Sequence, residues 1–242
     1  MTIRTIQEWG AEWLGLGSSV GWDNGPDIDE RIDHALKLWD ELATIAPAWK
    51  RESMGYPGGL DDRDVRYRRG NKDKARDPEH ELEHELLVGN PVRECLGWTV
   101  ADGINEIPLV NSRSGQITAD VLLLGRRECE WRIFLLEVKS TSNDPWYAAL
   151  EHLRQLAMFL AGGDMRRLFH QRGWDLPQPD TIPVKGLVFA PSRFYRRENG
   201  STHSAHVEPT RRLFERLRAH DARADVKLAT HGLSRHEVVE YE

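Results

Sequence analysis

Two strongly apolar runs in the middle of the chain dominate its pattern of hydrophobic and polar positions. They are GQITADVLLL (115–124) and WRIFLLEV (131–138), and the short charged segment GRRECE joins them. Leucine-rich and β-branched runs of this length suit strands that are buried on both faces, and so short a connection favours antiparallel neighbours. The pattern therefore predicts a strand pair at the centre of a sheet.

The segments on either side of this pair predict an alternation of helices and strands. Helical spacing of apolar residues is expected over 78–89, 144–161 and 208–219, and further strands over 98–110, 184–195 and 226–230. The predicted order is helix, three strands, helix, strand, helix, strand. It indicates an α/β fold.

The part of the chain before residue 78 has a different character. Residues 1–50 read as an N-terminal helical cap of two helices, the second ended by Pro47, with tryptophans that belong to a core. Residues 51–77 form a charged linker or loop in which arginines alternate with aspartates. It is either a solvated loop or a strip that contacts phosphates. Residues 78–242 then form the main domain.

Three charged residues interrupt the apolar strand pair: Asp120, Glu137 and Lys139. Burying unpaired carboxylates costs several kcal/mol, so a compensating group is needed. Glu137 and Lys139 lie two residues apart and share a strand face, which Asp120 can approach from the neighbouring strand. Two carboxylates beside an ammonium can hold Mg²⁺ and activate water. The alternative is a simple ion pair on the strand face, with Asp120 ending its strand.

This pattern resembles the PD-(D/E)XK nuclease superfamily, in which an acid on one strand is followed on the next by an acid, one apolar residue and a lysine. Here the positions are Asp120 and Glu137-Val138-Lys139. The resemblance implies a restriction-endonuclease-like core, with a mixed central sheet flanked by helices, over about 78–230. It also implies that Asp120, Glu137 and the Val138 carbonyl coordinate Mg²⁺ (or Mn²⁺), while Lys139 holds the attacking water and helps to deprotonate it.

Two helices supply further candidates. On the helix from Pro78, steps of 100° place Glu79 and Glu83 on the inward face, and the resemblance implies that one of them completes the metal shell. His80 and His84 are lesser candidates by the same resemblance. On the later helix, Gln155 and Phe159 resemble the glutamine-x-x-x-tyrosine motif of the RecB-like branch, with phenylalanine in place of tyrosine. An exposed glutamine explains Gln155 equally well.

The helix from Pro78 also contains a competing metal motif. His80-Glu81-Leu82-Glu83-His84 satisfies HExxH, in which two histidines one turn apart bind Zn²⁺ and the glutamate acts as base. Zincin helices are normally buried and uncharged around these ligands, whereas this helix carries additional glutamates. A zinc protease is therefore the disfavoured alternative.

Composition limits the partners and the compartment. The net charge is −6, so no general basic field marks a nucleic-acid binder, and binding would need local clusters of arginine. Such clusters are Arg193, Arg196 and Arg197, and Arg211, Arg212, Arg216 and Arg218. With two cysteines, no apolar leader and no long apolar run, we expect a reduced, cytoplasmic protein that does not span a membrane.

The expected function is that of an Mg²⁺-dependent nuclease that hydrolyses phosphodiester bonds. Nucleic acid is the expected partner, with DNA favoured, and restriction, repair or defence against mobile elements is the setting that the resemblance implies. A homodimer is compatible with it. The alternative from another class is a nucleic-acid-binding or interaction module on the same fold whose activity is weak or lost.

Overall fold

The computed structural model describes most of the chain outside its longest polar loop. The described residues are 6–16, 28–52, 78–112, 115–140, 144–161, 181–196 and 206–242, together with 168, 172–174, 176 and 178. Most of the predicted linker over 51–77 lies outside them. The division into three segments therefore stays a prediction.

Seven strands form one mixed sheet in which strands that are neighbours in sequence pair with each other. Their bounds are β1 Glu94–Cys95, β2 Trp98–Ser112, β3 Gly115–Arg127, β4 Glu130–Val138, β5 Val184–Phe189, β6 Val226–His231 and β7 Glu237–Glu240. The first four strands are antiparallel, β5 and β6 run parallel to β4, and β7 is antiparallel to β6. Because β1 also pairs with β7, the sheet closes on itself.

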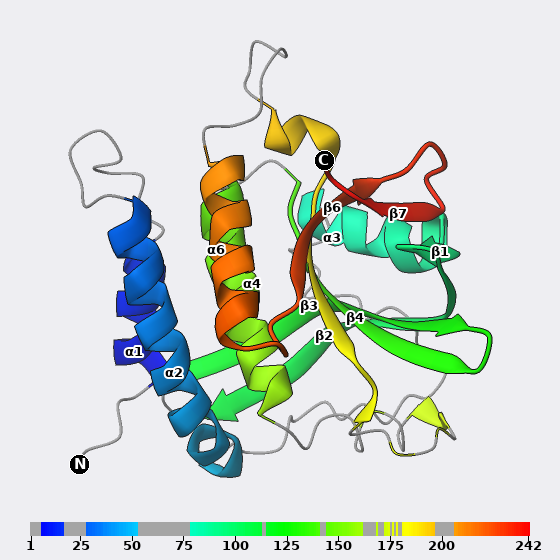
Figure 1. Cartoon of the computed structure of the whole chain (residues 1–242). Coiled ribbons are helices and arrows are strands. Elements are labelled where there is room, and N and C mark those ends of the chain that lie inside the picture. Colours follow the sequence, from blue (N-terminus) through cyan, green and yellow to red (C-terminus); the bar gives the residue numbers. More distant parts are fainter. Residues whose placement is uncertain are drawn as a thin grey trace.

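Helices flank this sheet. Their bounds are α1 Ile6–Gly15, α2 Ile28–Glu52, α3 Pro78–His84, the π-helical turn η2 Glu85–Gly89, α4 Pro145–Leu160, the 3₁₀ turn η4 Ser192–Tyr195 and α6 Val207–His220. Figure 1 shows α4 and α6 between the α1–α2 pair and the strands, with α3 on another side of the sheet. None of the described helices has the length and apolar character needed to cross a bilayer.

The predicted α/β class and the predicted order of elements are confirmed from α3 to β6, whereas several boundaries differ. The strands β1 and β7 were not expected. The strand predicted over 184–195 ends at Phe189, because Pro191 precedes the separate turn η4.

The prediction that Pro47 ends the second helix is wrong. Helix α2 continues past this residue to Glu52. Proline removes one helical hydrogen bond. The extra turn, however, buries Trp49, which packs edge-to-face against Trp9 with ring centroids 6.1 Å apart. Burial of so large a side chain offsets the cost of the proline.

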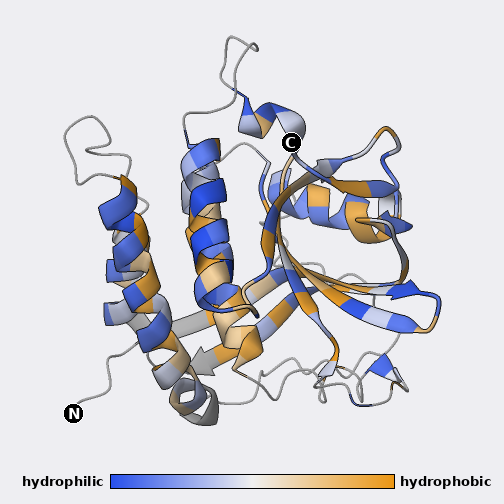
Figure 2. Ribbon diagram, viewed as in Figure 1, coloured by the Kyte–Doolittle hydropathy of each residue, from blue (hydrophilic) through white to orange (hydrophobic). Residues whose placement is uncertain are grey.

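The sheet has two cores, one on each face. The larger core joins the sheet to α1, α2, α4 and α6 and contains buried tryptophans, as predicted for Trp9 and Trp13. The smaller core joins the other face to α3 and η2 through Leu82, Leu86 and Leu87. In β4, Ile133 and Leu135 enter the first core, whereas Phe134, Leu136 and Val138 enter the second. Figure 2 shows the hydrophobic positions of α2 turned toward the neighbouring helices.

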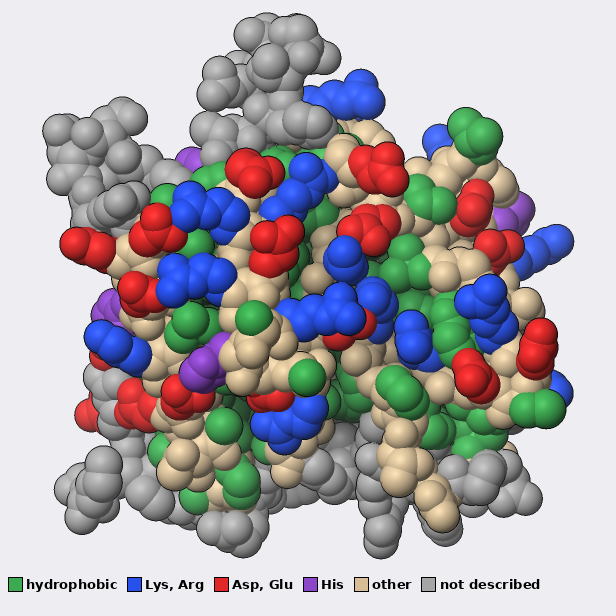
Figure 3. All heavy atoms as spheres, in the orientation of Figure 1, with side chains coloured by type: hydrophobic (Ala, Val, Ile, Leu, Met, Phe, Trp, Pro, Cys, Tyr) green, Lys and Arg blue, Asp and Glu red, His purple; other side chains and the backbone are tan. Residues whose placement is uncertain are grey.

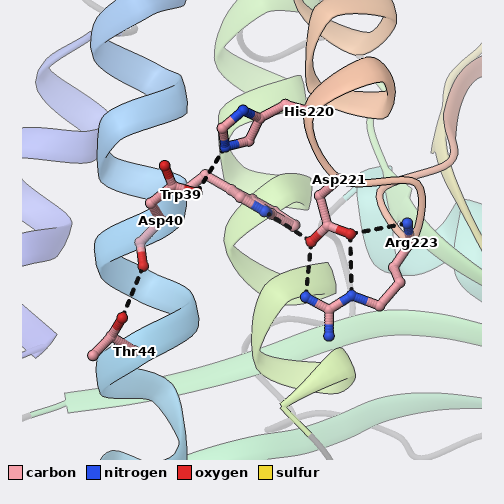
Figure 4. Close-up of polar contacts among 6 residues, drawn as sticks. All are labelled: Trp39, Asp40, Thr44, His220, Asp221 and Arg223. Atoms are coloured by element: carbon pink, nitrogen blue, oxygen red, sulfur yellow. Dashed lines mark hydrogen bonds and ion pairs between the residues drawn. The ribbon is translucent and has the colours of Figure 1, made fainter.

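Polar contacts fix α2 against the C-terminal end of α6. The Trp39 indole N–H donates to Asp221, whose carboxylate also accepts from Arg223, and His220 lies 2.7 Å from Asp40 (Figure 4). Further along, Arg212 and Arg216 pair with Asp29. Acidic and basic side chains are accordingly intermixed over this face in Figure 3. These two arginines of the predicted phosphate-contact cluster are therefore already engaged by carboxylates.

Candidate metal and catalytic site

The register of β3 and β4 brings the predicted strand residues together. Val121 pairs with Leu136, so the next step along the antiparallel register places Asp120 beside Glu137. The Val138 N–H, which lies between Glu137 and Lys139, donates to Asp120 Oδ2 over 2.8 Å. Asp120 therefore contacts the backbone of the Glu137–Lys139 segment, as the sequence predicts.

Lys139 is the centre of this cluster and is only 6% exposed. Its Nζ lies 2.6 Å from Glu137 Oε1, 3.1 Å from Glu151 Oε2 and 3.7 Å from Glu79 Oε2. The three carboxylates come from β4, α4 and α3, so the ammonium connects the sheet to helices on both of its faces. If all three were ionised, their negative charge would exceed the single positive charge of the lysine.

A second group of polar side chains continues the cluster toward α3 and β2. Glu83 is buried on the inward face of α3, as predicted, and Glu83 Oε2 accepts from Asn105 Nδ2 over 3.0 Å. Glu83 Oε1 lies 3.2 Å from His80 Nδ1, and the other ring nitrogen of His80 lies 3.6 Å from Glu106 Oε1. Both predicted helix carboxylates, Glu79 and Glu83, are thus near the strand residues.

Burial shifts the protonation of the carboxyl groups. Desolvation raises the pKa of Glu83 to about 7, against the hydrogen bond from Asn105, and it raises the pKa of Asp120 to about 7, against the charge of Lys139. The pKa of Glu137 is well above its ordinary value because of burial and the charge of Asp120. Without added positive charge, this cluster retains protons near neutral pH.

The pKa of Lys139 shifts in the opposite direction to the one expected from burial alone. Desolvation would lower the pKa of Lys139, but the charges of Glu137 and Glu151 outweigh it and hold the pKa above its ordinary value. Lys139 is therefore a cation at neutral pH. It can hold a water molecule or a phosphate oxygen by donating hydrogen bonds, as expected. A lysine that is already protonated cannot take a proton from that water, so the expected help of Lys139 in deprotonating it is not supported.

The donor atoms beside Lys139 fit a hard divalent cation. Glu137 is 2% exposed, and its Oε2 has no hydrogen-bond partner, so one buried carboxylate oxygen is available. The N–H of Val138 points toward Asp120, and in an extended strand the carbonyl of the same residue points the same way. Two carboxylates and a carbonyl, completed by water, match the oxygen ligands that Mg²⁺ prefers. Within the described residues, no three His, Cys, Asp or Glu side chains are already grouped as a metal cage.

Gln155 is buried, so the alternative that it is simply an exposed glutamine is wrong. It is 5% exposed because α4 is buried on nearly all sides, and its side chain lies next to the fully buried His152. No described contact joins it to the carboxylate cluster. The predicted catalytic role of Gln155 therefore stays a prediction.

The HExxH residues of α3 separate in the structure. His80 faces Glu83 and Glu106, whereas Glu81 and His84 are exposed. His80 is thus a neighbour of the buried carboxylates, whereas the other two motif residues face solvent. This arrangement does not support the zinc-protease alternative.

Sequence reasoning missed three members of the cluster. Asn105 and Glu106 interrupt the apolar run INEIPLV, which is the same signal that identified Asp120. Glu106 also has a left-handed backbone (φ 49°), which is unusual for a glutamate within a strand. Glu151 carried no such signal, since a glutamate on a helix is ordinarily solvent-exposed.

Comparisons with known proteins do not assign the chain to a family. No protein-family model matches the chain, and no curated protein or solved structure matches it significantly. The assignment of a function therefore depends on the residues of the cluster and on the order of the elements that carry them.

Proposed function

We propose that this chain is a divalent-cation-dependent nuclease that hydrolyses phosphodiester bonds, with DNA as the favoured substrate. The observation that carries the proposal is the meeting of Asp120, in the middle of β3, with Glu137 and Lys139 at the C-terminal end of β4, with one buried Glu137 oxygen unpartnered. Such a cluster is costly to bury unless a cation compensates it.

The element order supports a PD-(D/E)XK core. A helix with inward acids precedes the antiparallel strands β2, β3 and β4, with only the two-residue strand β1 between them. Asp120 lies on β3, the Glu137-Val138-Lys139 motif lies at the end of β4, and α4 then leads to the parallel strand β5. This is the arrangement that the resemblance implies. The closure of the sheet through β1 and β7 is an addition to it.

The residues divide the chemistry between them. A bound Mg²⁺ or Mn²⁺ would supply Lewis-acid stabilisation of charge on the phosphate and would lower the pKa of water. Asp120, Glu137 and the Val138 carbonyl would hold it. Lys139 orients the attacking water and stabilises negative charge as a permanent cation. Glu83, whose pKa burial raises to about 7, is suited to accept a proton near neutral pH.

The substrate class follows from the resemblance and from the remaining basic side chains. Arg193 and Arg196 are exposed at the turn after β5 and stay candidates for phosphate contacts. The α6 arginines are less available, because Arg218 and Arg211 also have partners, in Asp225 and in the Tyr241 carbonyl.

The proposal is tested by nicking of supercoiled plasmid DNA in Mg²⁺ or Mn²⁺, with and without a chelator. We expect chelator-reversible cleavage that falls at least about 100-fold in Lys139→Ala and in Glu137→Gln, since each removes a charge from the reacting centre. Glu215→Gln, an exposed change on α6, serves as the matched control and should cleave normally.

Equal cleavage by the wild type and both site variants would contradict the proposal, because a contaminating nuclease behaves in that way. Metal-independent cleavage would contradict it as well. Retarded migration of DNA with no cleavage would instead support the nucleic-acid-binding module.

A further inference from the structure

We propose that Glu151 is the positioning residue for Lys139, keeping the ammonium at the site when a cation occupies the Asp120 and Glu137 oxygens. The inference rests on the proposed function and adds a residue to it. It starts from the observation that the ammonium has three carboxylate neighbours, of which only Glu151 lies on α4.

Glu137, the closest carboxylate to Lys139, is also a proposed ligand of the cation. Glu137 Oε1 lies 2.6 Å from Nζ, and Glu137 Oε2 is the buried oxygen without a hydrogen bond. A divalent cation on Glu137 withdraws negative charge from that contact and repels the ammonium across a short distance. Lys139 then needs a second carboxylate to stay where it is.

Glu151 has the geometry for this task. Its Oε2 forms an ion pair with Lys139 Nζ over 3.1 Å and makes no hydrogen bond among the described residues. The side chain is 21% exposed, so the pair is screened less than a surface pair would be. This oxygen of Glu151 therefore lies beside Lys139 and is not hydrogen-bonded to another described residue.

Helix α4 gives this carboxylate a rigid support. The helix is N-capped by Asp144, whose side chain accepts from the Tyr147 N–H, and it is packed against β3, β4 and β5. Glu79, in contrast, lies 3.7 Å from Nζ on the seven-residue helix α3. Of the two helix carboxylates, Glu151 is thus the closer and the better supported.

The test follows the Lys139 ammonium directly by ¹⁵N-detected NMR in the full-length protein. It compares wild type, Glu151→Gln and Glu151→Asp, each with and without Ca²⁺ as the probe cation. We expect a protected Lys139 ammonium signal in all three proteins without Ca²⁺, because Glu137 holds it. With Ca²⁺, the signal should persist in wild type, disappear in Glu151→Gln and return in part in Glu151→Asp, which keeps the charge.

Kinetics in Mg²⁺ provide a second readout. Glu151→Gln should lower kcat by about 10-fold to 100-fold with little change in KM, since a displaced lysine affects the reacting centre more than substrate binding. Glu215→Gln is again the control. A purely structural pair would change thermal stability without this split between kcat and KM.

The outcomes separate the two proposals. Calorimetry that detects no Ca²⁺ binding to the wild type overturns the proposed metal site, and this inference with it. Ca²⁺ binding accompanied by a persistent Lys139 signal in Glu151→Gln overturns the role of Glu151 alone. Loss of the signal in Glu151→Gln before Ca²⁺ is added also overturns it, because the residue would then act in the metal-free protein.

Discussion

At the scale of single residues, one rule of solvation accounts for most of the site. Charged side chains that interrupt an apolar strand need compensation. This rule identifies Asp120, Glu137 and Lys139 in the sequence, and helical spacing adds the inward face that buries Glu83. Glu151 could not be predicted in this way, because its contact depends on where α4 packs against β4.

The raised carboxyl pKa values predict that cation binding depends on pH. Asp120 has a pKa of about 7 because of its burial, so below that pH a cation must displace its proton. The apparent affinity for Mn²⁺, measured by calorimetry, should therefore fall by roughly tenfold or more from pH 6 to pH 5. Asp120→Asn should bind weakly at every pH. An affinity that is independent of pH in the wild type would show that no proton is displaced.

At the scale of elements, periodicity predicted the long helices and strands but not the short ones. β1 has two residues and β7 four, too few for a repeat to be recognised. Their pairing closes the sheet and is a tertiary event that joins residues 94–95 to 237–238. Likewise, the buried position of Gln155 depends on α4 being covered on nearly all sides, which its own stripe of leucines does not reveal.

The continuation of α2 past Pro47 gives a prediction about this element. Pro47 lies inside the helix and removes a hydrogen bond, while the following turn buries Trp49. Pro47→Ala should raise the free energy of unfolding by about 1 to 2 kcal/mol, less than the full cost of an interior proline because the unfolded chain also gains freedom. Urea denaturation measures this change. A destabilised Pro47→Ala protein would mean that the proline fits this helix without strain.

At the scale of the whole molecule, the site makes folding stability depend on pH. Glu83 and Asp120 keep protons to about pH 7 when folded, but lose them near their ordinary pKa values of 4.5 and 3.8 when unfolded. Protons are thus released on unfolding in this window, so these groups stabilise the fold at low pH and lose that effect as pH rises toward 7.

We therefore expect the metal-free protein to be more stable at pH 5 than at pH 8, by on the order of a few kcal/mol from these groups. Thermal or urea denaturation measures the difference. In Glu83→Gln, which mimics the protonated group, the dependence should be weaker. Mg²⁺ at about 100 times its Kd should raise the free energy of unfolding by roughly 2.7 kcal/mol at pH 8. Higher stability at pH 8 than at pH 5 without metal would contradict the assigned burial of the cluster.

The central claim is that Asp120 and Glu137 share a divalent cation beside Lys139. Its most direct test is an anomalous difference map from a crystal of the wild-type protein soaked in Mn²⁺. We expect one strong peak, about 2.2 Å from an oxygen of each carboxylate and close to the Val138 carbonyl. A map without a peak between these two side chains, or with its strongest peak at His80 and His84, would contradict the account.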